Sequence, residues 1–366
     1  MLKFLKDSWL IAGISLLLLL VVDAALKSLL EETQLPLVLP GATAPNQENS
    51  PALGDATWAS AYFRELRQAR RTEWSAWEYW RRKPFSGEYI NIDGSGLRRS
   101  WSPDEPTHTI WMAGGSTVWG TGARDDHTLP SALARSLAQR GIKARVLNLG
   151  ESGYVSGQSQ LRVLRRLESE PAPDLVVFYD GVNDVYAALQ AGEAGLSQNE
   201  AHRRADFRVT DGLDNYLQAA PRVLEGIQRL LARNAKPAMP AVAPLAAEVA
   251  KRYAFRVELT AAAAAAAGVK TTFIWQPSVF SKAAKAPVEV RIENASLARH
   301  RELQLASDQA VAQRLSGTEF FFDMTGSLDD HPEALLLDFC HLSEAGNRVI
   351  AERLAPQVLT LLANDW

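Results

Sequence analysis

The chain is poor in cysteine and in net charge, and each shortage excludes a class of protein. Cys340 is the single cysteine among 366 residues. An internal disulfide is therefore impossible, and so is a zinc site built from several cysteines. The formal net charge of -3 gives no strongly basic surface, so we expect no nucleic-acid partner. The length suits one large domain, alone or with a smaller appendage.

The N-terminus carries a long apolar run. Lys3 and Lys6 precede this run, which extends from Trp9 to Leu26. Roughly 17 to 20 apolar residues are enough for a helix to cross a bilayer. Lysines before the run and acidic residues after it favour an N-in orientation. We therefore expect residues 1–30 to be a membrane anchor and the remainder to be extracytoplasmic, in the periplasm or outside the cell.

Two other interpretations of this run stay open. It can be a cleaved signal peptide, with a poor cleavage site near Val22-Asp23-Ala24. It can also be a buried core helix, although the polar, proline-containing stretch that follows argues against this. The anchor and the signal peptide both imply export of the chain.

Residues 31–105 differ in character from the rest. Residues 33–55 have the composition of a linker or an irregular arm. Residues 56–82 show aromatic side chains at near-helical spacing among arginines, which predicts a helix. Its aromatic side chains either pack on the main domain or line a groove for a sugar or a lipid. Short extended strands with a glycine-containing turn are expected next.

From residue 106 onward, short apolar runs alternate with helical patterns. Such alternation predicts βαβ units and a parallel sheet, here in a three-layer α/β/α domain. The stretch 191–268 is too long for a simple crossover, and we interpret it as a helical insertion that either shapes the active site or is inert. The five predicted strands are Thr109–Met112, Ala144–Leu149, Asp174–Tyr179, Thr271–Trp275 and Glu319–Met324.

Chemically useful residues follow four of these strands. In open α/β sheets, ligands bind beyond the carboxyl ends of the strands. Ser116 follows the first strand in GGST, Gly153 the second in GESGY, and Asn183 the third in DGVND. Asp338 and His341 occur in DFCH, in a later loop after the fifth. We expect these residues to meet at one edge of the sheet.

This set of residue types suits attack on an acyl carbon. A serine hydroxyl needs a base to accept its proton, and His341 can be that base. Asp338 lies three residues earlier and can orient the imidazole and stabilise its charged form. The backbone N–H groups of Ser116 and Gly153 and the amide of Asn183 are suitable donors to an oxyanion.

The segments GGSTVWGTG, NLGESGYVSGQ, YDGVND and DFCHLSEAGN resemble the four sequence blocks of the SGNH hydrolases, the GDSL esterase/lipase family. The resemblance covers the chain from about Thr109 to the C-terminus apart from the predicted insertion, and it implies a flavodoxin-like SGNH hydrolase fold over a domain of residues 106–366. It implies that Ser116 is the nucleophile, His341 the base and Asp338 its partner, with Gly153 and Asn183 completing the oxyanion hole. One departure is that Gly115 stands where the GDSL motif has aspartate.

The expected reaction is hydrolysis of an acyl ester, with no metal or organic cofactor. The expected substrate is an acylated small molecule or polysaccharide, foremost O-acetyl groups on an extracytoplasmic glycan or envelope component. Alternatives are O-acyl transfer by the same triad, lipase or thioesterase activity, and a non-catalytic envelope assembly subunit. The sequence does not separate hydrolysis from transfer.

Overall fold

The computed structural model describes residue 9 and residues 13–22, 47–54, 56–204 and 240–363. It divides into two units, one of residues 1–39 and 199–239, the other of residues 40–198 and 240–366. In the first unit, residues 13–22 are helical. None of the helices in the described ranges combines the length and the apolar character that a membrane span requires. The anchor predicted over residues 1–30 lies largely outside the described residues and stays a prediction.

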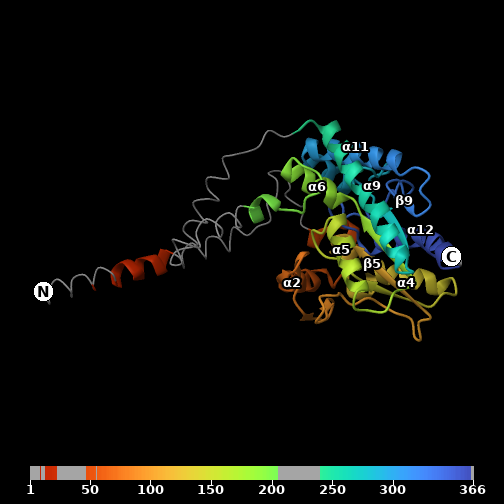
Figure 1. Cartoon of the computed structure of the whole chain (residues 1–366), viewed down its shortest axis with the longest axis horizontal. Coiled ribbons are helices and arrows are strands. Elements are labelled where there is room, and N and C mark those ends of the chain that lie inside the picture. The colour runs from red at the N-terminus through yellow and green to blue at the C-terminus, as the bar shows by residue number, and fades with distance from the viewer. Residues whose placement is uncertain (1–8, 10–12, 23–46, 55, 205–239, 364–366) are drawn as a thin grey trace. The chain divides into compact units, whose positions relative to one another are not determined.

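The second unit contains a sheet of five parallel strands (Figure 1). Its strand order is β6-β5-β7-β8-β9, which is 2-1-3-4-5 in chain order, as in flavodoxin-like sheets. All six residues of β7, the central strand, are buried, as a strand covered on both faces requires. The predicted α/β fold with a five-stranded parallel sheet is confirmed. The strands are β5 (His108–Gly114), β6 (Ala144–Asn148), β7 (Leu175–Asp180), β8 (Lys270–Trp275) and β9 (Phe321–Asp323).

Helices cover both faces of this sheet. On one face, side chains of α4 and α12 join a core cluster with Ile110, Val177 and Ile274. On the other face, α5 contacts β5 and β7, and α9 contacts β8, where Tyr253 meets Trp275 edge to face. The helices of this layer structure are α4 (Leu129–Gln139), α5 (Ser156–Leu167), α6 (Val182–Ala191), α9 (Val242–Ala266), α10 (Pro287–Ala295), α11 (Ala298–Arg314) and α12 (Glu344–Ala363).

The end of the predicted insertion is a helix of the main layer. Helix α9 buries Val249, Tyr253 and Val257 and lies beside α11 (Figure 1). It connects to β8 directly, because Gly268 has a φ of 72° and ends the helix at a tight turn. Residues 242–266 therefore act as the crossover helix before β8. Residues 205–239, the centre of the predicted insertion, lie outside the described residues.

The prediction of a helix over residues 56–82 is wrong for the second half of that range. Helix α2 (Ala59–Ala69) forms, but it is followed by an antiparallel hairpin of β1 (Thr72–Ser75) and β2 (Tyr79–Arg82). Trp77 in the hairpin turn has a φ of 72°, which a continuing right-handed helix excludes. A second, shorter pair of strands follows, β3 (Phe85–Ser86) and β4 (Asn91–Ile92), in agreement with the predicted extended segments.

Helix α2 packs onto the loop that follows the first sheet strand. Tyr62 and Leu66 are buried in a cluster with Trp119. The Tyr62 hydroxyl accepts a hydrogen bond from Gly122 N at 2.8 Å and donates one to Gly120 O at 3.2 Å. These aromatic side chains therefore pack on the main domain, whereas Trp74 and Trp77 of the hairpin are exposed.

A buried ion pair holds the loop that carries the predicted aspartate and histidine. Lys282 Nζ lies 2.6 Å from Glu289 Oε2, and both side chains are fully buried. Glu289 Oε1 accepts hydrogen bonds from the backbone N–H groups of Leu335 and Leu336 at 3.0 and 3.1 Å. The pair thus fixes the start of the segment that leads to Asp338.

We expect Glu289→Ala to destabilise the protein by about 3–5 kcal/mol, because it leaves the buried Lys282 charge and the loop N–H groups without their acceptor. Urea denaturation measures the change. Glu248→Ala is the matched control, since Glu248 forms an exposed pair with Arg252 at 2.9 Å and its loss should cost less than about 1 kcal/mol. Equal effects of the two substitutions would contradict the role given to the buried pair.

Candidate active site

Three side chains from separate parts of the chain form one hydrogen-bonded line. His341 Nε2 lies 2.7 Å from Ser116 Oγ, and His341 Nδ1 lies 2.6 Å from Asp338 Oδ2. A carboxylate can only accept, so Nδ1–H donates to Asp338 and leaves Nε2 as the acceptor for the serine hydroxyl. The structure thus brings together the hydroxyl, imidazole and carboxylate that the sequence singled out.

The backbone around Ser116 explains how the hydroxyl reaches this position. Strand β5 ends at Gly114, and Ser116 begins the short helix α3 (Ser116–Trp119). A side chain at Gly115 would place its Cβ 2.3 Å from Asn183 Nδ2. The glycine that departs from the family motif therefore lets the Asn183 amide approach the backbone beside the serine.

The carboxylate of Asp338 is buried and has several donors. Burial by itself would raise its pKa, but the positive charge of His341 and hydrogen bonds from the imidazole lower the pKa to about 2. Asp338 Oδ1 also accepts from the backbone N–H groups of Cys340 and His341 at 2.9 and 2.8 Å. Asp338 is therefore ionised throughout the neutral range and fixed in orientation.

The pKa of His341 shifts in the opposite direction from that of Asp338. Burial would lower the pKa of the imidazole, but the adjacent Asp338 charge outweighs burial and raises the pKa well above its ordinary value. The arrangement thus favours the protonated imidazole, the form that would exist after a proton has been taken from Ser116.

The three predicted oxyanion donors border the same site. Asn183 is the second residue of α6, just after β7, and its Nδ2 donates to Tyr154 O at 2.8 Å. Gln198 Nε2 donates to Asn183 Oδ1 at 2.9 Å, which fixes which end of the amide faces Gly115. Gly153 has a φ of 80°, a left-handed conformation that glycine adopts without strain. Within the described ranges, the backbone N–H groups of Ser116 and Gly153 have no protein acceptor.

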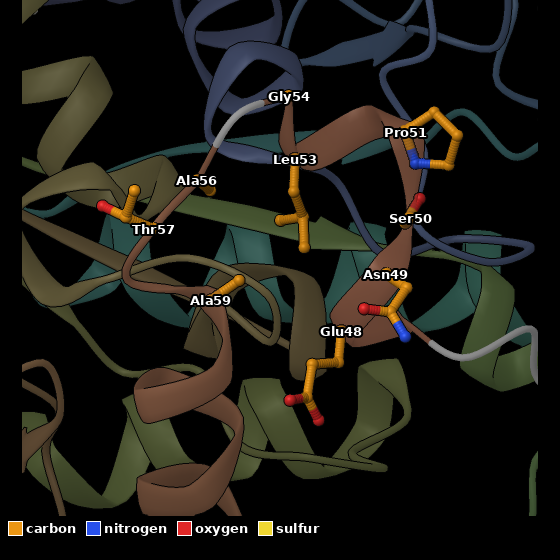
Figure 2. A pocket seen from close by; sticks show the side chains of 9 residues that line it. All are labelled: Glu48, Asn49, Ser50, Pro51, Leu53, Gly54, Ala56, Thr57 and Ala59. Atoms are coloured by element: carbon orange, nitrogen blue, oxygen red, sulfur yellow. The ribbon is translucent and has the colours of Figure 1, made fainter.

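Sequence reasoning missed a fourth hydrogen-bond donor to Asp338. Gln47 Nε2 donates to Asp338 Oδ2 at 2.5 Å, from the 3-10 turn η1 (Gln47–Asn49). A second turn, η2 (Pro51–Leu53), follows, and this arm lines a pocket of about 390 Å³. Figure 2 shows Leu53 pointing into the space between the arm and the start of α2. The contact spans 291 residues, so no local pattern in the sequence signals it.

One group of side chains in the described ranges has donor atoms close enough for a metal ion. These are Asp338, Cys340 and His341, whose donor atoms lie within 4.8 Å of one another. Burial raises the pKa of the Cys340 thiol, so a metal ion bound here would have to displace its proton. His341 Nδ1 already donates to Asp338, so the group is better suited to proton transfer than to metal binding.

One comparison with known proteins identifies a family. A family model described as the GDSL-like lipase/acylhydrolase family matches residues 112–349. Among curated proteins, none matches the chain.

Several solved structures are similar to this chain at low identity. A carbohydrate acetylesterase family member from Sinorhizobium meliloti is 17% identical, with 70% of this chain and 100% of that chain covered and a TM-score of 0.38. The acetyl xylan esterase AlAXEase is 15% identical, with 68% and 99% covered and a TM-score of 0.40. A catalytic mutant of Axe2, an acetylxylan esterase from Geobacillus stearothermophilus, is 15% identical, with 71% and 96% covered and a TM-score of 0.39.

Proposed function

Since the chain belongs to the GDSL-like lipase/acylhydrolase family and is a carboxylic ester hydrolase, we propose that it works through a Ser116–His341–Asp338 triad. The observation that carries this proposal is the hydrogen-bonded line from Asp338 Oδ2 through the imidazole to Ser116 Oγ, with both contacts at 2.7 Å or less. This geometry supplies a nucleophile, a base and an orienting carboxylate in contact with one another.

The proposed reaction has two stages. Ser116 Oγ attacks the acyl carbon while His341 Nε2 takes its proton, and His341 then returns that proton to the leaving alcohol. A water molecule gives its proton to His341 and attacks the acyl-enzyme, which releases the acid and restores the serine hydroxyl. The oxyanion that forms in each stage is stabilised by the N–H groups of Ser116 and Gly153 and by the Asn183 amide.

The proposed substrate is an O-acyl ester, foremost an O-acetyl ester, on an extracytoplasmic glycan or envelope component. Two features support this choice. The apolar run of residues 1–30 supports anchoring in a membrane and export of the catalytic unit. The hairpin β1–β2 exposes tryptophan side chains, which suit contacts with sugar rings.

Substrate profiling of the full chain in detergent tests this proposal. We expect hydrolysis of p-nitrophenyl acetate and of O-acetylated oligosaccharides, with kcat/KM falling as the acyl chain is lengthened to octanoate and palmitate. A preference for the long chains would contradict the acetyl-ester assignment and favour a lipase. Transfer of the acetyl group to a sugar acceptor, with little free acetate, would favour acyl transfer.

Gln47 should position Asp338 in this triad. Its amide shares Asp338 Oδ2 with the imidazole, so its loss should concentrate the carboxylate charge on His341 and raise the pKa of the imidazole. We expect Gln47→Ala to lower kcat about 10-fold, in line with the loss of one hydrogen bond to a charged group, with little change in KM. The acidic limb of the kcat/KM–pH profile should move to higher pH.

The matched control is Asn49→Ala, because Asn49 lies in the same turn η1 and lines the arm pocket without contacting the triad (Figure 2). If the two variants had the same pH profile and the same kcat, Gln47 would have no positioning role.

A further inference from the structure

Three aromatic rings form a continuous row on the hairpin β1–β2. The ring centroids of Trp74 and Tyr79 are 6.0 Å apart, and those of Tyr79 and Trp80 are 6.5 Å apart. Tyr79 and Trp80 are nearly parallel, at 19°. Trp74, at the outer end of the row, is 71% exposed. Tyr79 and Trp80 are half-buried, so Trp74 presents most of the exposed ring surface of the row.

The inner end of this row lies at residues 149–155, the loop between β6 and α5 that carries Gly153 and that we call the oxyanion loop. Trp80 Nε1 donates to Ser152 O at 3.0 Å, and its ring meets Tyr154 edge to face at 5.6 Å. A Cβ added to Gly153 would lie 3.5 Å from Trp80 Cζ2. The ring of Trp80 is thus a direct neighbour of a proposed oxyanion donor, and the row extends outward from the catalytic site.

Several hydrogen bonds and an ion pair fix the hairpin to the rest of the domain, although Trp74 and Trp77 are exposed. Arg82 on β2 forms a buried ion pair with Glu151 at 3.1 Å and donates to Ser152 Oγ at 2.6 Å. At the turn, Gln158 Nε2 donates to Glu78 O at 2.7 Å, and Arg165 donates to Ala76 O at 2.8 Å. These contacts tie the hairpin to the oxyanion loop and to α5.

The backbone within this frame is strained. Tyr79 has a φ of 75°, in the left-handed region that bulky residues rarely adopt. Such strain persists where surrounding contacts enforce it, which is common at ligand-binding sites. Trp77 in the turn shares this conformation with a φ of 72°, and Tyr79 is the middle ring of the row.

The chemistry of the hairpin surface selects among ligands. Its exposed large hydrophobic residues are aromatic, and no aliphatic side chain of that class accompanies them on β1, β2 or the turn between them. An acyl chain would be better matched by aliphatic residues. Flat aromatic faces carry negative charge density and suit the polarised C–H groups of a pyranose ring.

We propose that Trp74, Tyr79 and Trp80 form a glycan-binding subsite that stacks on sugar rings of a polymeric substrate and leads its acyl ester to Ser116. This inference rests on the proposed function, since it assigns the part of the glycan beyond the scissile ester to this row. The ligand is a glycan of several residues, because the row extends away from the catalytic hydroxyl by more than one ring.

The test compares the kcat/KM values of the full chain for two kinds of substrate. One is a panel of O-acetylated neutral and acidic hexasaccharides, and the other is p-nitrophenyl acetate, which has no sugar. We expect Trp74→Ala to lower the ratio of the two kcat/KM values about 10-fold, mainly through KM for the hexasaccharide, as the loss of one stacking contact predicts. Trp74→Phe should restore most of the ratio because it keeps an aromatic face.

Trp77→Ala is the matched control, since Trp77 is 72% exposed on the same hairpin but has no ring contact with the row. An unchanged ratio in Trp74→Ala, or an equal fall in Trp77→Ala, would overturn the subsite. Preferential loss of binding to anionic lipid vesicles, with no effect on any hexasaccharide, would assign the row to a membrane surface and also overturn it. Failure of the proposed function is distinguishable, because it would abolish the Ser116 dependence of p-nitrophenyl acetate hydrolysis.

Discussion

Replacing Ser116 by alanine is expected to lower kcat for p-nitrophenyl acetate on the order of 10⁶-fold, the scale seen when a serine nucleophile is removed. The hydroxyl is the only group that could form the acyl-enzyme in the line described above, because His341 Nε2 faces it at 2.7 Å. The remaining donors would still bind an ester, so KM should change far less than kcat. Initial rates at saturating ester measure the effect.

Ser102→Ala serves as the control for this substitution, since Ser102 is an exposed serine outside the site. Both variants should keep the unfolding temperature of the parent, because Ser116 contributes no core contact. Retention of more than about a tenth of the parent kcat in Ser116→Ala would show that another group is the nucleophile.

The second large effect is expected from Asp338→Asn, which keeps the shape of the side chain and removes its charge. We expect kcat to fall about 10⁴-fold, because an amide can hold the imidazole in the wrong tautomer. The carboxylate raises the pKa of His341, so its removal should lower that pKa. The base is active when neutral, and the acidic limb of kcat/KM should therefore move to lower pH.

The direction of this pH shift separates a catalytic role from a structural one. A variant that is merely destabilised would lose activity at every pH without moving the limb. Asp330→Asn is a suitable control, because Asp330 is an exposed aspartate that pairs with Arg353. A limb that stays in place, or moves to higher pH, would contradict the electrostatic role of Asp338.

The strand pattern allowed the sheet and much of the site to be predicted from the sequence. A strand buried on both faces must be continuously apolar, as residues 175–179 are, and its end must carry the polar residues that face a ligand. Helix α5, at Ser156–Leu167, lies between the second and third sheet strands, as the alternation of strand and helix patterns predicts. These features are local, and the fold class and the order of the strand ends follow from them.

The aromatic hairpin shows where periodicity misleads. The aromatic residues of 56–82 recur at near-helical spacing, yet Trp77 and Tyr79 adopt positive φ. Contacts made elsewhere enforce that conformation, notably those of Arg82 with the oxyanion loop. Such long-range contacts override the local helix propensity, and they cannot be recognised in the sequence.

The same limit applies to Gln47. Its contact with Asp338 joins the N-terminal arm to the last loop of the domain, and neither segment carries a motif that points to the other. The chemical roles of the residues at the strand ends could be inferred from residue type. The hydrogen bond from Gln47 to the Asp338 carboxylate could be found only in the structure.

The most direct measurement is covalent labelling of the full chain with a fluorophosphonate, followed by peptide mapping. A single phosphonyl group should be found on Ser116, and labelling should fall in Asp338→Asn in proportion to kcat/KM. A label on another serine, or none on a protein that still hydrolyses p-nitrophenyl acetate, would contradict the assignment of Ser116 as nucleophile.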